Sequence, residues 1–217
     1  MKKTGNDGNI IGKATYMNRT RNFIKAFFSF TAFLISMNSF SQNDSVRYFF
    51  KEIGMTIKVP QNFKVVDSSE DEELRDKGQK TLEQANNTEL NLSSTKNLLS
   101  IKDGDFNYMN ITITPFKETQ NKTWKQDNKV VKNMLYKSFA GKIPANNIDT
   151  ITTYKKIDEL SFDKFLMTMR LNQSMTLKMI VYSKFYKGYD LGICYLFVDA
   201  EKGKQLDTII ETAKFDR

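Results

Sequence analysis

The carboxy-terminal third of the chain constrains the fold most, because its apolar residues recur with the period of two that is typical of β-strands. Residues 162–171, 176–186 and 189–198 each place a row of large apolar side chains on one face. The three rows are Phe165, Met167, Met169 and Leu171, then Leu177, Met179, Val181 and Phe185, and then Tyr189, Leu191, Ile193, Tyr195 and Phe197. The pattern predicts three neighbouring strands of one sheet.

The opposite faces of these strands are apolar as well. They carry Leu166, Ile180, Tyr182, Cys194, Leu196 and Val198. Strands that are apolar on both faces are usually buried on both, so we expect the centre of the sheet to be covered on its two sides. Lys187 and Gly188 form a tight turn between the last two strands, which predicts antiparallel pairing.

Three other segments have the features of helices. Residues 69–85 begin with Ser69 and the acidic residues 70–73, which we interpret as a solvated helix start rather than a cation site or an acid–base pair. The second helix covers residues 123–140, with Gly141 as its C-terminal cap, and the third begins at the N-cap Asp199 and ends near residues 214–215. The third helix has the apolar stripe Leu206, Ile209, Ile210 and Ala213.

The helix at residues 123–140 has one apolar stripe, with lysines in the gaps between its members. The stripe consists of Trp124, Val131, Met134, Leu135 and Phe139, and the lysines are Lys125, Lys129, Lys132 and Lys137. Packing against the sheet is the simpler interpretation of the stripe, and an exposed face that binds a partner is the alternative.

Four shorter segments upstream have β-propensity. Residues 55–59 and 63–66 form two short strands or one interrupted edge strand, and residues 98–101 and 110–114 form a hairpin around Asp103 and Gly104. The spacing of Asp103, Asp105 and Asn107 imitates a calcium loop, but the sixth and twelfth positions of that loop are Tyr108 and Thr114, which are unsuitable. Together the elements predict an α+β, three-layer α/β/α sandwich, with a central, mainly antiparallel sheet of about six strands flanked by helices.

The first 41 residues have the three-part layout of a secretory signal peptide. A twelve-residue apolar run at 26–37 follows Arg19, Arg21 and Lys25 and precedes small residues that favour cleavage after Ser41. The run is shorter than the roughly 20 residues that span a membrane. We expect residues 1–41 to be a leader, with translation starting at Met17, and residues 42–217 to be a single exported domain that is secreted or periplasmic.

Removal of the leader would lower the net charge of the chain from its full-length value of +8. The leader holds six of the 33 basic residues and one of the 25 acidic residues, which leaves 27 basic and 24 acidic residues and a net charge of +3. A charge of this size, spread along the chain, does not predict nucleic-acid binding.

The composition excludes most catalytic chemistry. The chain has no histidine and one cysteine, so it has no Ser/His/Asp or Cys/His pair, no imidazole metal site and no intramolecular disulfide. Cys194 lies within a strand and is expected to be a buried, unreactive side chain. Two S-x-x-K tetrads, Ser93 to Lys96 and Ser161 to Lys164, lie in a loop and a strand, where serine and lysine do not share a face. We therefore predict no catalytic, cofactor-binding or metal-binding residues and no enzyme activity.

Three parts of the chain resemble exported bacterial proteins of the PsbP-like class, whose name refers to the extrinsic photosystem II protein. They are residues 55–63, the hairpin around Lys187, Gly188 and Tyr189, and the ending from 199–204 through 214–215. The resemblance spans residues 53–216 and implies an antiparallel sheet with helices on both faces and a non-enzymatic binding or assembly role. The Lys/Asn-rich style and the leader also resemble secreted proteins of the Bacteroidota.

Three functions remain open on the sequence. The leading hypothesis is an exported, non-catalytic binding or assembly module of the bacterial cell envelope, which predicts an exposed apolar or aromatic patch near the helices. The second is a secreted hydrolase that uses carboxylate or Ser/Lys chemistry, and the third is a protein that keeps its leader as a membrane anchor. For the leading hypothesis we expect a monomer without a cofactor, whose partner is an unknown envelope protein or small ligand.

Overall fold

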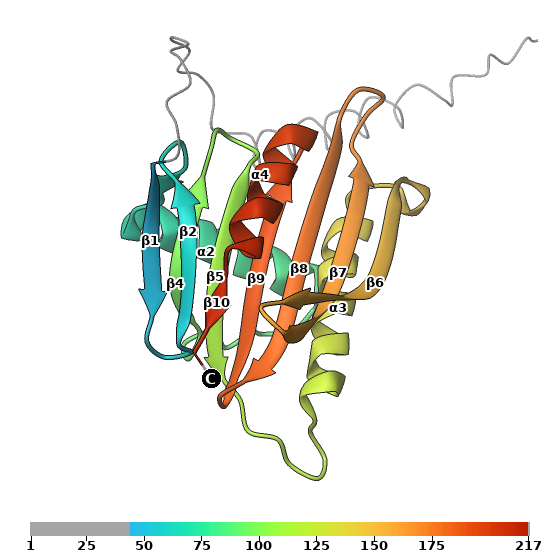
Figure 1. The fold of residues 1–217 in the computed structure, drawn as a ribbon. Coiled ribbons are helices and arrows are strands. Elements are labelled where there is room, and N and C mark those ends of the chain that lie inside the picture. The colour runs from blue at the N-terminus through green and yellow to red at the C-terminus, as the bar shows by residue number, and fades with distance from the viewer. Residues whose placement is uncertain (1–43, 217) are drawn as a thin grey trace, which may run out of the picture. The chain divides into compact units, whose positions relative to one another are not determined.

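The computed structural model describes residues 44–216, which form two antiparallel sheets and three α-helices. A seven-stranded sheet forms the middle layer (Figure 1). Helices α2 and α3 cover one face of this sheet, while α4 and a three-stranded sheet cover part of the other. The expected α+β sandwich is therefore confirmed.

The large sheet has the strand order β3-β4-β5-β9-β8-β7-β6, and the small sheet has the order β1-β2-β10. Every neighbouring pair in both sheets is antiparallel. The strands of the large sheet are β3 (Lys64–Val65), β4 (Lys96–Lys102), β5 (Tyr108–Pro115), β6 (Ile148–Ile157), β7 (Leu160–Arg170), β8 (Thr176–Tyr186) and β9 (Tyr189–Phe197). Those of the small sheet are β1 (Ser45–Phe50), β2 (Met55–Pro60) and β10 (Lys214–Phe215).

The helices are α2 (Ser68–Asn86), α3 (Trp124–Ala140) and α4 (Ala200–Glu211), and a short 3-10 turn covers Ala145–Asn147. Asp199 caps α4 as predicted, because its carboxylate accepts hydrogen bonds from the backbone N–H groups of Glu201 and Lys202. Gly141 ends α3, but its φ of −73° is not the left-handed conformation that usually selects glycine at a helix end.

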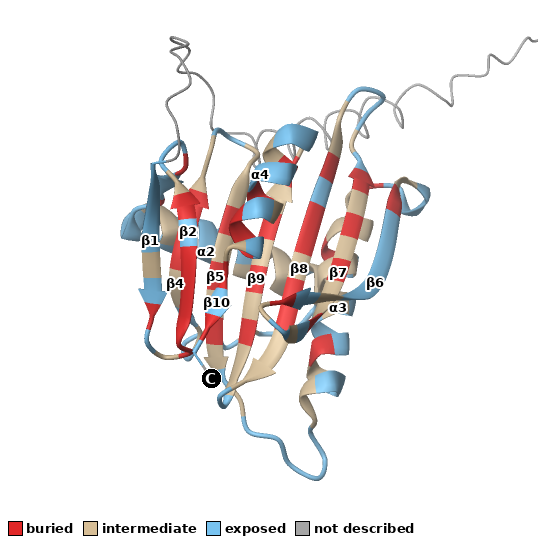
Figure 2. Cartoon of the chain, viewed as in Figure 1, coloured by how far each residue is buried: buried red, intermediate tan, exposed pale blue. Residues whose placement is uncertain are grey.

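The two faces of the large sheet are each buried in their own apolar cluster, as the sequence predicts. Leu191, Ile193 and Tyr195 of β9 pack on the α4 side, whereas Met167 and Met179 pack on the α3 side. Figure 2 shows buried positions along the central strands and mostly exposed positions on β6. Most of the lateral strand β6 is thus left uncovered by the helices.

The turns of two hairpins match their prediction. Lys187 and Gly188 both have positive φ, 48° and 82°, and they join β8 to β9. Gly104 has a φ of 77° in the loop that joins β4 to β5. These are the conformations for which Gly is favoured in tight turns.

The large sheet has seven strands, close to the expected number of about six, but β1, β6 and β10 are not among the predicted strands. Residues 55–59 and 63–66 form two short strands, which is the first of the two predicted alternatives, and they belong to different sheets, with β2 in the middle of the small one. The last helix ends at Glu211, because Thr212 turns towards β2 and its hydroxyl accepts a hydrogen bond from the backbone N–H of Lys58. Residues 214–215 then pair with β2 instead of extending the helix.

Helix α2 begins earlier than predicted, and its first acidic residues are not all solvated. Its N-cap is Asp67 rather than Ser69. Glu70 forms an ion pair with Lys102 at 2.5 Å, and Asp71 accepts hydrogen bonds from Asn97 and Ser100 of β4. These carboxylates therefore hold α2 on the sheet, in place of a buried apolar face.

The predicted leader, its cleavage after Ser41 and the start at Met17 lie outside the described residues. Within residues 44–216, no helix is both long and apolar enough to cross a bilayer.

Candidate functional site

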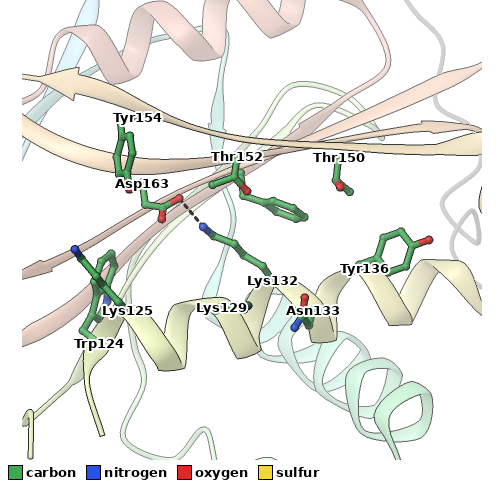
Figure 3. Close-up of a pocket in the computed structure, with 11 residues that line it drawn as sticks. Trp124, Lys125, Lys129, Lys132, Asn133, Tyr136, Thr150, Thr152, Tyr154 and Asp163 are labelled. Carbon is green, nitrogen blue, oxygen red and sulfur yellow. Dashed lines mark hydrogen bonds and ion pairs between the residues drawn. The ribbon is translucent and has the colours of Figure 1, made fainter.

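A groove of about 570 Å³ lies between α3 and the strands β6 and β7, at the lateral edge of the large sheet (Figure 3). This volume is in the range of small-molecule and peptide sites. Helix α3 contributes Trp124, Lys125, Lys129, Lys132, Asn133 and Tyr136 to the lining, and the strands contribute Thr150, Thr152, Tyr154, Asp163 and Phe165. We refer to these eleven residues as the edge groove.

The start of α3 is fixed by local hydrogen bonds that the sequence permits. Thr123 and Gln126 form a capping box, in which each side chain bonds the backbone N–H of the other residue. The indole N–H of Trp124 donates to Asp190 of β9 at 2.7 Å. Further along the helix, Leu135 and Phe139 pack on the apolar cluster of the sheet. These contacts hold the groove side of α3 in one orientation.

One ion pair crosses the edge groove. The ammonium group of Lys132 on α3 lies 2.6 Å from the carboxylate of Asp163 on β7, and each side chain is only 15% exposed. A pair in this position restricts the distance between helix and sheet. It also neutralises the only carboxylate among the lining residues.

The remaining charge of the edge groove is positive. Three lysines and one aspartate line it, and Lys132 already pairs with that aspartate. Lys125 and Lys129 are exposed and make no ion pair with any described residue. The groove therefore presents two free cations, which favour an anionic ligand or segment.

Uncharged parts of the groove are unusually accessible. Tyr154 is 74% exposed, and Thr150 and Thr152 on the same face of β6 are also exposed. Val131 of α3 is not part of this lining and is 45% exposed, so the prediction that it packs on the sheet is wrong. An exposed aromatic side chain next to unpaired cations is typical of a recognition surface.

Asp190, the acceptor of the Trp124 indole, provides a pH-dependent test of this arrangement. Burial raises the pKa of this carboxyl, the hydrogen bond from Trp124 opposes the rise, and the nearby charge of Asp127 adds to it. A raised pKa means that the folded chain binds the proton more tightly than the unfolded chain. The contribution of this carboxyl to the free energy of unfolding is therefore fully present below about pH 3.9, the pKa of an unfolded aspartate, and it is lost as the pH rises through the pKa of the folded chain.

We expect Asp190→Asn to be more stable than the wild type at pH 7, because the amide accepts the same indole hydrogen bond without a buried charge. The advantage should shrink as the pH falls towards 4, and urea unfolding at both pH values measures it. Asp105→Asn, in an exposed loop, is the control and should show no such pH-dependent gain. An Asp190→Asn variant that is less stable at pH 7 would contradict this assignment.

The two serine–lysine tetrads do not form reactive pairs. The hydroxyl of Ser93 donates to Asn91 in a turn, while Lys96 of β4 forms an ion pair with Glu52. Ser161 lies on the α3 face of β7, and Lys164 lies on the opposite face, where its ammonium group is 5.5 Å from the ring centroid of Tyr182. The alternation of side chains in a strand thus separates this second pair.

Cys194 is packed into the apolar cluster on the α3 side of the sheet. Burial raises the pKa of its thiol to about 12, so the reactive thiolate form is disfavoured. In residues 44–216, no three cysteine or acidic side chains are grouped in a way that could hold a metal ion. Asp103, of the calcium-like spacing, instead accepts hydrogen bonds from Asn62 and Lys202.

The sequence reveals one wall of the edge groove but not the other. Trp124 and the lysines of α3 form a recognisable helical pattern, whereas Thr150, Thr152 and Tyr154 lie in a strand that was not predicted. The available signal was the β-branched and aromatic run at residues 150–154. Residues 150–154 lie next to Asp163 and Phe165 because β6 pairs with β7, and this pairing cannot be predicted from the sequence alone.

Comparisons with known proteins leave the family of this chain open. No known family model and no curated protein matches it in sequence. Among solved structures, it is similar to cyanobacterial PsbP (CyanoP) from Synechocystis sp. PCC 6803, with 12% identity and a TM-score of 0.48 over 84% of this chain and 99% of that one. It is also similar to LpqN, involved in cell envelope biogenesis of Mycobacterium tuberculosis, with 10% identity and a TM-score of 0.41 over 80% and 91% of the two chains.

Likeness at this level carries no function from either protein to this chain. CyanoP is a PsbP protein, the class that the sequence resembles, while nothing in the comparisons bears on the resemblance to secreted proteins of the Bacteroidota.

Proposed function

We propose that this chain is an exported, non-catalytic binding or assembly module of the bacterial cell envelope, and that the edge groove is its binding surface. The single observation that carries the proposal is the groove itself, where the exposed ring of Tyr154 faces two unpaired lysines. Exposed apolar or aromatic surface that is bordered by polar and charged side chains is typical of interaction sites. The signal-like leader supports export, and the lack of histidine and of a formed Ser/Lys pair supports a role without catalysis.

We expect a partner in the envelope to bind through this groove. The chain is used as bait in an envelope extract of the organism that encodes it. Lys125→Glu combined with Lys129→Glu should abolish capture of the partner, because the double variant reverses the groove charge without touching a buried residue. Mass spectrometry compares the material captured by the double variant with the material captured by the wild type.

A matched control separates the groove from net charge. Lys64→Glu combined with Lys80→Glu makes the same change of charge at exposed positions on β3, at the opposite edge of the sheet, and on α2. This control should capture the same partner as the wild type. Equal capture by all three proteins, or no partner above background for the wild type, would contradict the proposal.

A further inference from the structure

Strand β6 is a long edge strand that has no bulge, no proline and no described strand paired with its outer side. It is the last strand of the large sheet, and no described strand pairs with its outer side. Its ten residues pair with β7 in an unbroken register from Ile148 to Ile157, without proline or a bulge. The opposite edge strand, β3, has only two residues. Natural proteins usually shorten, bulge or cover their sheet edges, so a long and regular edge is a template for another strand.

The outward backbone groups of β6 belong to the residues that line the edge groove. Asp158 and Glu159 form a two-residue turn with positive φ values of 43° and 72°, and the flanking residues Ile157 and Leu160 are register partners. In a turn of this kind the two flanking residues, Ile157 and Leu160, form a hydrogen-bonded pair. Along an antiparallel strand, only every second residue directs its N–H and C=O groups towards the paired strand, so on β6 the odd-numbered residues bond to β7. The N–H and C=O groups of Thr150, Thr152 and Tyr154 therefore point away from β7.

The side chains beside this edge select for negative charge. Thr150, Thr152 and Tyr154 line the same groove as Lys125 and Lys129. A strand added outside β6 would place every second side chain on the α3 face of the sheet, next to these two unpaired ammonium groups. Acidic side chains at those positions would be attracted, and basic ones would be repelled.

The same charges disfavour a second copy of the chain at this edge. Two β6 strands that pair antiparallel are related by a twofold axis perpendicular to the sheet. Both α3 helices would then lie on one face and bring Lys125 and Lys129 of each copy towards the joint. Four unpaired lysines at one interface oppose that dimer, whereas an acidic segment neutralises them.

We infer that β6 accepts an extended, acidic peptide segment of a partner protein as an additional strand, with its carboxylates next to Lys125 and Lys129. This inference rests on the proposed binding function and names the chemistry of its partner. Main-chain hydrogen bonds to Thr150, Thr152 and Tyr154 supply the register, and the lysines supply the preference for acidic residues.

The probe is a synthetic ten-residue peptide in which glutamate alternates with valine. Trp124 is the single tryptophan of the chain and lines the groove, so its fluorescence reports occupancy directly. We expect a saturable change of this fluorescence at peptide concentrations up to about 1 mM, the weak end of specific recognition. A peptide with lysine in place of glutamate, and one with N-methylated backbone amides on alternate residues, should bind at least tenfold more weakly.

Two pairs of variants separate backbone pairing from charge. Thr152→Pro removes an outward N–H that β7 does not use, and it should weaken binding at least tenfold, whereas Thr152→Val keeps that N–H and should stay within about twofold. Lys125→Glu with Lys129→Glu should also weaken binding at least tenfold, and Lys64→Glu with Lys80→Glu should not. Circular dichroism and a urea unfolding curve confirm that each variant is folded.

Each remaining outcome overturns the inference. Absence of a fluorescence change at about 1 mM peptide excludes the acidic segment. Binding that is lost on charge reversal but is unaffected by Thr152→Pro and by N-methylation shows an electrostatic contact without an added strand. A dimer with its β6 amides protected in the free chain assigns the edge to a second copy. In all three cases, groove-dependent capture from the envelope extract would still leave the proposed function standing.

Discussion

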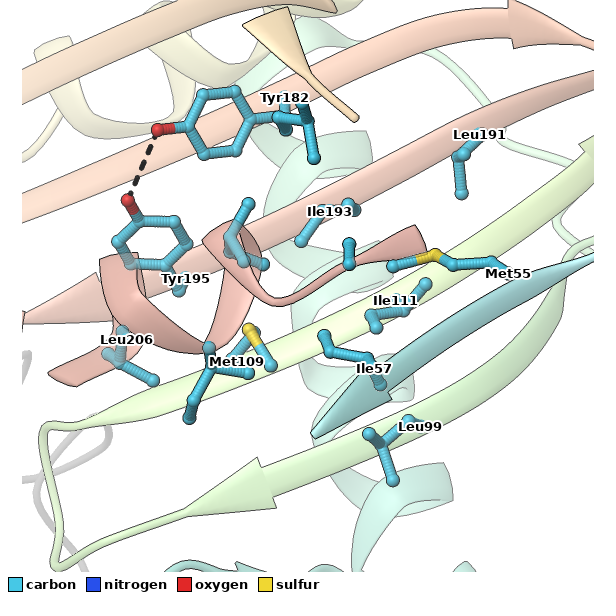
Figure 4. Packing of buried hydrophobic residues seen from close by; sticks show 14 of the residues in the cluster. Met55, Ile57, Leu99, Met109, Ile111, Tyr182, Leu191, Ile193, Tyr195 and Leu206 are labelled. Atoms are coloured by element: carbon cyan, nitrogen blue, oxygen red, sulfur yellow. Dashed lines mark hydrogen bonds between the residues drawn. The ribbon is translucent and has the colours of Figure 1, made fainter. Parts of the chain in front are cut away.

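Replacing Ile193 with alanine is expected to lower the free energy of unfolding by about 2–5 kcal/mol, and Met167→Ala should do the same from the other side of the sheet. Both side chains have no exposed surface. Ile193 faces the α4 side among Leu191, Met109 and Ile111 (Figure 4), and Met167 lies in the cluster that α3 covers. Each truncation leaves a cavity that the neighbouring strands cannot fill.

Urea unfolding measures both changes against Ile151→Ala. Ile151 is an apolar residue of the same sheet that is 55% exposed, so its truncation should cost less than about 1 kcal/mol. Large losses for Ile193 and Met167 with a small loss for Ile151 indicate a sheet that is buried on both faces and open at β6. A small loss for either buried residue would mean that its face of the sheet is exposed to water.

Gly203→Ala is expected to destabilise the chain by about 1–3 kcal/mol, although the same change usually strengthens a helix. Gly203 is buried in α4, and a Cβ atom there would lie 2.7 Å from Cδ2 and 2.8 Å from Cζ of Phe197. The Phe197 ring is itself 8% exposed and is stacked on Tyr195, so it has little room to move. The close approach of α4 to β9 requires glycine at this position.

Gly78→Ala is the matched control, because Gly78 lies in the exposed helix α2 and a Cβ atom there would meet nothing within 4 Å. This variant should be more stable by up to about 1 kcal/mol through helix propensity alone. Thermal and urea unfolding give both values. If Gly203→Ala proved as stabilising as Gly78→Ala, α4 would not pack on Phe197 as described.

The sequence predicts the centre of the fold well because the physical signal there is strong. Residues 162–198 are apolar on both faces, and only a doubly covered sheet buries them. Asp199 and the stripe through Leu206 and Ile210 likewise determine where α4 begins and which face it buries. In each case the spacing of apolar residues in the sequence corresponds directly to the positions that are buried in the structure.

The periphery is less predictable because its residues are not buried. Strand β6 is mostly exposed, so the alternation that marks the other strands is absent, and only its β-branched composition indicates a strand. Strand β10 has two residues, and its pairing with β2 depends on contacts made by Thr212. For the same reason the sequence suggests the α3 wall of the edge groove but not the wall formed by Thr150, Thr152 and Tyr154.

Amide hydrogen exchange on the chain bound to its captured envelope partner tests most directly whether a partner occupies the edge groove along β6. We expect the amides of Thr150, Thr152 and Tyr154 to exchange much more slowly in the complex than in the free chain, while the exchange of amides at exposed positions in α2 stays unchanged. Unaltered exchange along β6, with new protection at another surface, would contradict it.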